Sequence, residues 1–388
     1  MNDAFIFLGV NDLQKHAILN AKSLGYRCIG FDRNKYAKSQ KYCDYFYNID
    51  STDISALFSK INTHKVDVKG IWANNDILVP TRLVLAYLLG IKDTDIATGV
   101  KMLDKLSFRG LVSAKNYFIP WEIVEKNDEC PLKFPVITKP VIGGGSQGIK
   151  IINNGNEYKA VNTGNPILIE SFIEGFELGI NIFTDGIKTQ RLGAVYRYFN
   201  HNKHHIPIGT ITEYDNKVIS KAFDVLEDYI NELNYYGMVK ADILIDRKGK
   251  VYLLELSPRF HGEIDTEYIF SYIDYSLSTQ YFRYLKNKDF SNQNFENEFH
   301  YGYISLFLDG HTKMPDIKFD KLPLEDFYGV ELLQHIPHRY YGEILSMKPR
   351  STYDIVAFSV FRSKEKLSDN NFLKISNKLN KIINAQNE

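Results

Sequence analysis

Residues 134–150, FPVITKPVIGGGSQGIK, contain the loop around which the rest of the chain can be interpreted. A short apolar strand ends on Lys139, a proline follows, and three consecutive glycines come next. Consecutive glycines leave the backbone N–H groups bare, and such groups can form a cradle for an anion, usually phosphate. A flexible hairpin loop with a solvated lysine is the alternative. No lysine–serine or lysine–threonine pair follows the glycines, which excludes a Walker loop. The residues of the predicted cradle are Gly143, Gly144, Gly145, Ser146 and Gly148.

A second informative stretch, residues 166–183, reads PILIESFIEGFELGINIF. Its apolar strand runs into Glu170, and Glu177 precedes a second run of alternating apolar residues. Two acids that flank an apolar turn fit a purine pocket, in which the backbone around Phe172 would contact adenine and Glu177 would accept from ribose hydroxyls. A strand with solvated acids at its turn is the alternative.

The most specific stretch is residues 239–262, VKADILIDRKGKVYLLELSPRFHG. Two alternating strands flank a glycine-containing turn, which predicts a β-hairpin. If Asp246 pairs with Val251, then Asp242 falls opposite Glu255. Because side chains alternate along strands, both carboxylates would point to one face of the hairpin.

The same register places Lys240 opposite Ser257 on that face. Two facing carboxylates among apolar residues repel each other unless a cation lies between them. Ligands that are all oxygen favour Mg²⁺ or Mn²⁺. Arg259 follows on the side where a metal-bound phosphate would lie. A structural salt bridge from Lys240 to one of the acids is the alternative.

The N-terminal segment alternates apolar strands with amphipathic helices, which predicts a parallel, doubly wound sheet. Gly9 after the first strand and Asp32 about 20 residues later resemble a dinucleotide-binding fingerprint, but the other two required glycines are missing. A nicotinamide site is therefore disfavoured. Residues 74–76, Asn-Asn-Asp, lie just beyond the strand at 70–73 and are interpreted as a loop and helix N-cap.

Length and composition set broad limits on function. The 388 residues are enough for two or three domains, and the 47 basic and 47 acidic residues balance, so no global charge favours nucleic acid or an anionic membrane. The three cysteines have no metal-ligand spacing, which suits a reducing cytoplasm. We find no apolar run of membrane-spanning length and expect a cytoplasmic protein.

In this order, the three stretches resemble the ATP-grasp superfamily, in the branch that holds carbamoyl-phosphate synthetase, biotin carboxylase and an amino-acid ligase. The resemblance covers residues 1 to about 285. It implies an α/β and α+β fold: a doubly wound domain at 1–100, an ATP-grasp domain at 101–285 with a lid at about 120–170, and a C-terminal α+β segment at 286–388. In these enzymes two α+β subdomains clamp ATP.

The resemblance also implies roles for individual residues. Family members usually have asparagine, a metal ligand, where this chain has Ser257, so the second metal site depends on a shorter side chain. The implied ATP-binding residues are Lys105 and Lys139 on the α- and β-phosphates, Gly143 to Gly148 over the β- and γ-phosphates, Glu170, Phe172 and Ile173 on adenine, and Glu177 on ribose. The implied metal ligands are Asp242, Glu255 and Ser257 for two Mg²⁺ or Mn²⁺ ions, and the implied catalytic residues are Arg259 and Lys240.

The implied reaction is phosphoryl transfer from ATP to a carboxylate, followed by attack of an amine on the acyl phosphate. The expected substrates are small molecules, and the predicted acceptor contacts are Arg197, His261 and Glu263. A polar HNKHH run at 201–205 is interpreted as a solvated loop. A bicarbonate-using carboxylase and a non-catalytic ATP-binding sensor are the alternatives. Many relatives are dimers, so a homodimer is compatible with the resemblance.

Overall fold

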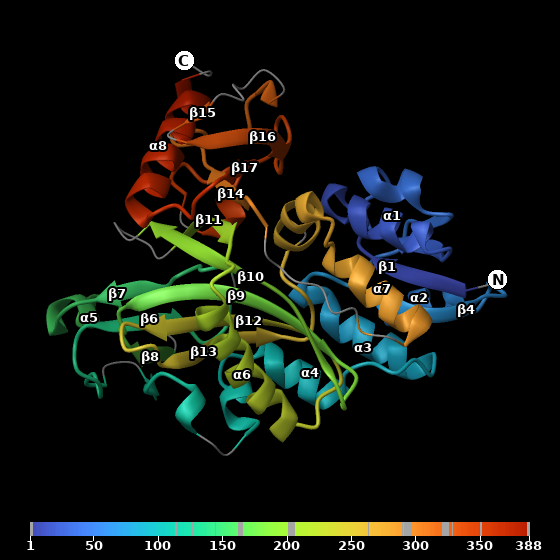
Figure 1. Ribbon diagram of the computed structural model, residues 1–388, viewed down its shortest axis with the longest axis horizontal. Coiled ribbons are helices and arrows are strands. Elements are labelled where there is room, and N and C mark those ends of the chain that lie inside the picture. Colours follow the sequence, from blue (N-terminus) through green and yellow to red (C-terminus); the bar gives the residue numbers. More distant parts are fainter. Residues whose placement is uncertain are drawn as a thin grey trace.

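The computed structural model describes residues 3–112, 115–125, 128–143, 145–161, 166–200, 206–262, 264–288, 290, 297–319, 326–327, 329–349 and 351–385. Three β-sheets organise these residues (Figure 1). A parallel sheet lies at the N-terminal end, a small antiparallel sheet carries the glycine-rich loop, and a nine-stranded antiparallel sheet runs through the centre of the molecule. The mixed α/β and α+β fold expected from the sequence is confirmed.

The N-terminal sheet has the order β3-β2-β1-β4, and all its pairings are parallel. One face packs on α1 and the other on α2 and α3, as expected of a doubly wound sheet. Asp32 accepts hydrogen bonds from the backbone N–H groups of Val10 (2.9 Å) and Asn34 (2.8 Å), so its carboxylate shapes the loops at the strand ends. The elements are β1 (Asp3–Leu8), α1 (Lys15–Ser23), β2 (Arg27–Phe31), β3 (Tyr45–Tyr47), α2 (Ile54–Ile61), β4 (Asp67–Trp72) and α3 (Val79–Leu88).

A helix from late in the chain fastens this sheet to the rest of the molecule. Helix α7 (Leu277–Asn287) lies beside α1 and β1 in Figure 1. Its Phe282 ring packs 4.6 Å from Phe5 of β1 and 5.4 Å from Trp72 of β4, between ring centroids. The same aromatic cluster includes Phe183 of the central sheet, so the two sheets share a core.

The small sheet has the order β5-β8-β6-β7 and is antiparallel throughout. Its strand β6 ends where the glycine-rich loop begins, as predicted. Between α4 and β5, the chain forms the short 3₁₀ turns η4 and η5. The elements are α4 (Ile96–Leu103), η4 (Ser107–Gly110), η5 (Lys115–Tyr117), β5 (Trp121–Val124), β6 (Val136–Pro140), β7 (Lys150–Ile152), α5 (Gly155–Val161) and β8 (Ile167–Ser171).

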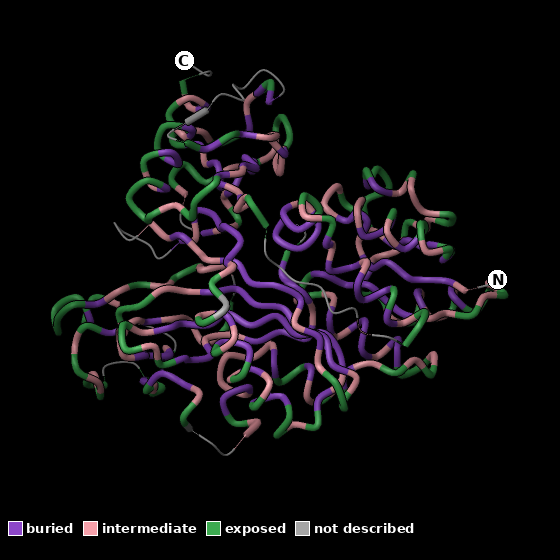
Figure 2. The backbone as a smooth tube through the Cα atoms, viewed as in Figure 1, coloured by how far each residue is buried: buried purple, intermediate pink, exposed green. Residues whose placement is uncertain are grey.

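The central sheet has the order β13-β12-β9-β10-β11-β14-β17-β16-β15. Its middle strands are among the most deeply buried segments (Figure 2). Helix α6 packs on the half that contains β9 and β12, and α8 packs on the half that contains β11 and β14. The elements are β9 (Gly175–Thr184), β10 (Thr189–Asn200), β11 (Ile206–Thr212), α6 (Asn216–Glu232), β12 (Gly237–Asp246), β13 (Val251–Ser257), β14 (His300–Leu306), β15 (Asp326–Phe327), β16 (Val330–Pro337), β17 (Ala357–Ser363) and α8 (Asp369–Ala385).

The C-terminal strands continue this sheet. Strand β14 pairs with β11, with Thr210 opposite Tyr303, so residues after 297 are joined to the preceding part of the chain by main-chain hydrogen bonds. The remaining short helices are η1 (Asp12–Gln14), η2 (Lys38–Tyr42), η3 (Asp76–Leu78), the π-helix η6 (Ile264–Ile269), η7 (Phe270–Ile273) and η9 (Thr352–Asp354). None of the helices in the described ranges combines the length and the hydropathy that a membrane span requires.

Candidate active site

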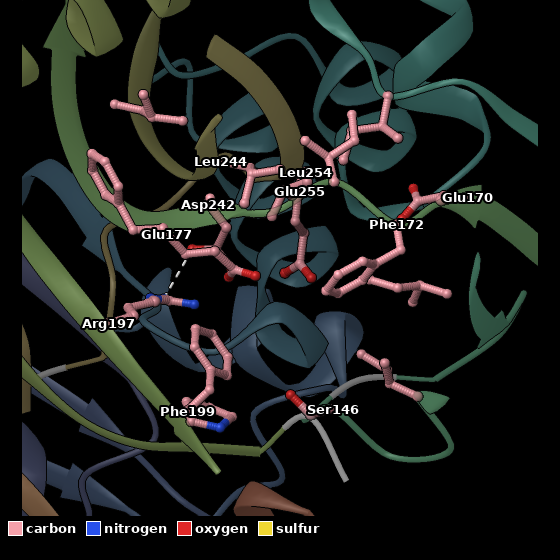
Figure 3. Close-up of a pocket in the computed structure, with 18 of the residues that line it drawn as sticks. Ser146, Glu170, Phe172, Glu177, Arg197, Phe199, Asp242, Leu244, Leu254 and Glu255 are labelled. Atoms are coloured by element: carbon pink, nitrogen blue, oxygen red, sulfur yellow. Dashed lines mark ion pairs between the residues drawn. The ribbon is translucent and has the colours of Figure 1, made fainter. Parts of the chain in front are cut away.

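A cavity of about 800 Å³ lies between the small sheet and the central sheet. The glycine-rich loop, the β8–β9 turn and strands β10, β12 and β13 line it. Figure 3 shows that Asp242 and Glu255 direct their carboxylates into one region of this cavity, with Leu244 and Leu254 beside them. Most residues singled out in the sequence therefore converge on one space.

The predicted pairs in the β12–β13 hairpin are present. Asp242 lies opposite Glu255 and Lys240 lies opposite Ser257. The assumed pairing at the turn was wrong, because Ile245 pairs with Val251 and the register shifts by one residue after Asp242. The extra residue in β13 compensates for the error at the turn, so the predicted acid pair survives.

The register shift is a β-bulge at Leu254, and it affects the composition of the cavity. Leu253 pairs with Ile243 on the opposite face, whereas Leu254 and Glu255 both line the cavity. At a bulge, two consecutive side chains can point to the same face of the sheet, whereas they alternate between faces along a regular strand. An apolar cluster formed by Ile119, Ile173, Leu244, Tyr252 and Leu254 thereby lies next to the carboxylates.

Three basic groups surround Asp242. Arg197 Nη2 lies 2.9 Å from Asp242 Oδ1, Lys240 Nζ lies 3.7 Å from Oδ2, and His261 Nε2 lies 2.8 Å from Oδ1. Burial alone would raise the pKa of Asp242, but the charges of Arg197 and Lys240 and the hydrogen bond from His261 lower it well below its usual range. Asp242 is therefore ionised at neutral pH.

Lys240 also contacts Glu255, with Nζ 2.8 Å from Oε1, so the salt bridge considered as an alternative is present in this structure. The Glu255 side chain is 43% exposed toward the cavity. Within the described ranges, no three histidine, cysteine or acidic side chains lie close enough to enclose a metal ion. Proteins usually bind Mg²⁺ through one or two carboxylates, and phosphate oxygens and water fill its other coordination positions. Asp242 and Glu255 therefore fit this ion.

The opposite wall of the cavity carries a buried ion cluster. Glu170 is 1% exposed, lies 2.5 Å from Lys139 Nζ, and accepts a hydrogen bond from Arg109 Nη2. Burial would raise the pKa of Glu170, but Lys139 and Arg109 together lower it. Arg109 was missed in the sequence, because a single arginine in an irregular connector gives no signal. Lys105 donates to the backbone carbonyl of Gly143, and burial lowers its pKa.

The glycine-rich loop adopts conformations that side chains resist. Gly143, Gly145 and Gly148 have φ angles of +135°, +62° and +77°. A Cβ atom on Gly145 would lie 2.8 Å from both the Thr352 hydroxyl and the Tyr353 ring. The Thr352 backbone N–H also donates to the Gly145 carbonyl (3.0 Å), so the loop contacts the C-terminal segment. Ser146 lines the cavity with φ of +60°.

The β8–β9 turn lines the end of the cavity near the apolar cluster. The Phe172 backbone N–H donates to Pro135 O (3.1 Å) inside the small sheet, so this N–H is not the predicted donor to a base. Phe172 and Ile173 both line the cavity. Glu177 lies opposite Arg197 in the β9–β10 pairing and faces the cavity near Asp242 (Figure 3). His261 is 2% exposed, and its backbone N–H donates to Asn181 Oδ1 (2.9 Å).

Arg259 and Ser257 meet a residue from the N-terminal segment. Asp76 accepts from Ser257 Oγ (2.6 Å) and from Arg259 Nε and Nη2 (2.7 and 2.6 Å). The sequence suggested a loop and N-cap at this place, and Asn75 does cap η3 through the Ile77 N–H (3.0 Å). The partnership of Asp76 with the hairpin was missed. Of the predicted site residues, Gly144 and Glu263 lie outside the described residues, as does the 201–205 run.

Comparison with known proteins identifies the central part of the chain. The sequence profile of the ATP-grasp domain matches residues 103–263, which contain the glycine-rich loop, the β8–β9 turn and the acidic hairpin. Residues 103–263 are an ATP-grasp domain. The resemblance expected from the sequence is therefore confirmed, and binding of ATP or ADP is the property that this domain family implies.

Similar proteins extend beyond the ATP-grasp domain. The formate-dependent phosphoribosylglycinamide formyltransferase of Methanocaldococcus jannaschii is 24% identical over 66% of this chain and 70% of its own length. The carbamoyl phosphate synthase large chain of Clostridium beijerinckii is 29% identical over 42% of this chain and 16% of its own. The crystal structure of an L-amino acid ligase from Bacillus licheniformis superimposes with a TM-score of 0.78, at 15% identity, over 98% of this chain and 97% of that one. The fold therefore extends along almost the whole chain.

Proposed function

We propose that this protein is an ATP-dependent carboxylate–amine ligase, which joins two small molecules through an acyl-phosphate intermediate. The observation that carries the proposal is the pair Asp242 and Glu255, which face one cavity together with Lys105 and Lys139. Acids for a phosphate-bound cation and lysines for the phosphates are what phosphoryl transfer requires. The L-amino acid ligase structure and a similar D-alanine–D-alanine ligase from Geotalea uraniireducens support the same class of reaction.

In this proposal the cavity binds ATP along its length. The adenine lies against the apolar cluster near Leu244 and Leu254, and the triphosphate extends toward Asp242 and Glu255. The proposed ATP contacts are Lys105, Lys139, Gly143, Gly145, Ser146, Gly148, Glu170, Phe172, Ile173 and Glu177. Asp242 and Glu255, with Ser257, would hold Mg²⁺ or Mn²⁺, which when bound neutralises charge on the β- and γ-phosphates.

The reaction has two steps. A carboxylate oxygen of the first substrate bonds to the γ-phosphorus, and the bond to the bridging oxygen breaks to release ADP. The amine nitrogen then attacks the acyl carbon, phosphate leaves with the acyl oxygen, and the amine loses a proton. Arg259 and Lys240 would offset the repulsion between the two anions in the first step, and the glycine-rich loop would keep water from the acyl phosphate.

Hydroxylamine trapping tests this mechanism. The purified protein is incubated with ATP, Mg²⁺, hydroxylamine and a panel of amino acids and other carboxylates, and nucleotides and hydroxamates are measured. ADP together with a hydroxamate for one carboxylate is expected, because hydroxylamine replaces the amine. AMP with pyrophosphate would mean adenylation and would contradict the proposal. Binding of ATP without turnover would instead favour the alternative function, a non-catalytic ATP-binding sensor.

Other parts of the proposal are more detailed than the fold and the family alone can indicate. They are the presence of two metal ions, the acceptor contacts Arg197 and His261, a homodimer, and the division of the chain near residues 100 and 285. These stay predictions. Metal titration, variants of the acceptor contacts, and mass measurement in solution would test them separately.

A further inference from the structure

Asp76 joins the N-terminal parallel sheet to the end of the acidic hairpin. It is the first residue of η3, four residues beyond the end of β4, and its side chain is 44% exposed. Its carboxylate accepts three hydrogen bonds, two from Arg259 and one from Ser257.

The contact with Arg259 fixes the plane of the guanidinium group. Asp76 Oδ1 accepts from Nε (2.7 Å) and Oδ2 accepts from Nη2 (2.6 Å), which is the two-point geometry of arginine with a carboxylate. Nη1 donates to the Phe260 carbonyl (2.8 Å), on the backbone that follows the hairpin. Because a guanidinium is planar, these contacts at three nitrogens define its orientation.

The contact with Ser257 acts on the neighbouring position. The Ser257 hydroxyl has one proton, and at 2.6 Å this proton is donated to Asp76, since an ionised carboxylate can only accept. The lone pairs of the Ser257 oxygen are therefore directed away from Asp76. The Asp76 carboxylate thus orients two side chains, Ser257 at the end of β13 and Arg259 just after it.

A purely local role for Asp76 does not explain this arrangement. The turn is already capped by Asn75, which accepts from the Ile77 N–H. Asn74 binds the same region, since its Nδ2 donates to the His261 carbonyl (2.8 Å). The loop of residues 74–76 is therefore shaped to meet residues 257–261, and it does so with one carboxylate and one amide.

We propose that Asp76 is a positioning residue, which holds Arg259 and Ser257 in the orientation needed for phosphoryl transfer. This inference rests on the proposed ligase function. The N-terminal sheet then contributes to the chemistry because its Asp76 aligns the positively charged guanidinium of Arg259. Misplacement of a catalytic group by about 1 Å can lower a rate about a hundredfold.

The chain offers a matched control for this ion pair. Asp93 also binds an arginine with both oxygens, since Arg82 Nη2 and Nε lie 3.2 Å from its two oxygens. The Arg82 side chain is fully buried, and Arg82 belongs to α3, away from the residues that line the cavity. Loss of this pair should affect folding but not the orientation of Arg259.

The test compares Asp76→Asn, Asp76→Glu and Asp93→Asn with the unchanged protein. For both Asp76 variants we expect kcat to fall about tenfold to a hundredfold, with KM for ATP changed by less than about twofold. Asp76→Glu keeps the charge and should also keep the melting temperature. Asp93→Asn should lower the melting temperature and leave kcat within about twofold. Unchanged kcat in both Asp76 variants would overturn the proposal.

A second readout needs no turnover. In protein labelled with ¹⁵N-arginine, the Nε–H signal of Arg259, assigned with Arg259→Lys, should exchange slowly with water and lose this protection in Asp76→Asn. An unprotected signal in the unchanged protein would contradict the orientation by Asp76. If no carboxylate gives ADP and hydroxamate but the signal is protected, the proposed ligase function fails while the geometry stands. The two failures are thus distinguishable.

Discussion

The acidic hairpin and the glycine-rich loop line the same cavity from opposite sides, and they differ in what fixes their shape. Strand β12 pairs with β9 over ten residues and with β13 on its other side, and most of its side chains are buried. The loop after β6 is shaped by glycines with positive φ and by contacts of Gly145 with Thr352 and of Gly143 with Lys105.

This difference suits the two proposed tasks. Carboxylates that hold a metal ion must keep a fixed separation, and strands within a sheet provide it. A loop that covers phosphates must open for each exchange of nucleotide, so a few contacts are preferable to a continuous ladder. Substitutions in the hairpin should therefore lower the rate of the chemical step, whereas substitutions in the loop should alter nucleotide affinity.

The largest expected effect is that of Glu255→Gln. The amide cannot supply the negative charge for a cation, so kcat should fall about a thousandfold. The melting temperature should hardly change, because the Glu255 side chain is 43% exposed. Steady-state ADP release and thermal unfolding measure the two quantities.

Glu174→Gln is the control for this change. Glu174 also lines the cavity, but it is 58% exposed and pairs with an exposed arginine, Arg247. Such pairs contribute little, so activity should stay near that of the unchanged protein. Retained activity in Glu255→Gln would remove the metal site from the hairpin.

A smaller effect concerns pH, and it also separates the two regions. Burial lowers the pKa of His261 beside the hairpin from 6.5 to about 4. Below pH 6.5 the unfolded chain takes up a proton that the folded protein does not, so the free energy of unfolding should decrease as the pH falls toward 4. The contribution is fully present above pH 6.5, and its loss amounts to about 3 kcal/mol at most.

Urea unfolding at several pH values measures this slope in the unchanged protein and in His261→Gln. Asp265, whose pKa burial raises to about 6, acts in the opposite direction, and His338 acts in the same direction as His261. The difference between the two slopes is therefore the quantity to compare. If the free energy of unfolding depends on pH equally in both proteins, His261 is not buried as a neutral imidazole.

The smallest expected effect is that of Gly145→Ala in the loop. Its φ of +62° costs an alanine about 1 kcal/mol, and the added Cβ would lie 2.8 Å from the Tyr353 ring. We expect KM for ATP to rise about tenfold with little change in kcat. Gly90→Ala is the control, because Gly90 has a similar φ of +67° and no neighbour within 4 Å. If both variants behave alike, the contact with Tyr353 has no role in binding ATP.

The hairpin could be predicted from the sequence because alternation and the position of the turn are local properties. Asp242 and Glu255 were paired correctly even though the turn was assigned one residue away. The bulge that compensates leaves one weak signal, the adjacent apolar pair Leu253 and Leu254, which breaks the alternation. The C-terminal α+β segment was also expected, and strands β14 to β17 with helix α8 form it.

Other features depend on how distant segments pack and have no local pattern. Asp76 looked like part of a capped turn, since its partners lie more than 180 residues away. Arg109 lies in the short 3₁₀ turn η4, and its partner Glu170 belongs to strand β8, about 60 residues later. The sequence also gave no sign that β14 would pair with β11, because strand order within a sheet is not encoded in either strand alone.

The pairing of β11 with β14 has a practical consequence for shortened versions of the protein. A chain ended near residue 285 would keep every residue of the ATP-grasp match but would leave the hydrogen-bonding edge of β11 without its neighbour. It would also uncover Tyr198, Ile208 and Ile211, which α8 and β14 now bury. Exposed apolar strand edges promote aggregation. The last hundred or so residues thus shield this strand edge and are expected to protect the protein from aggregation.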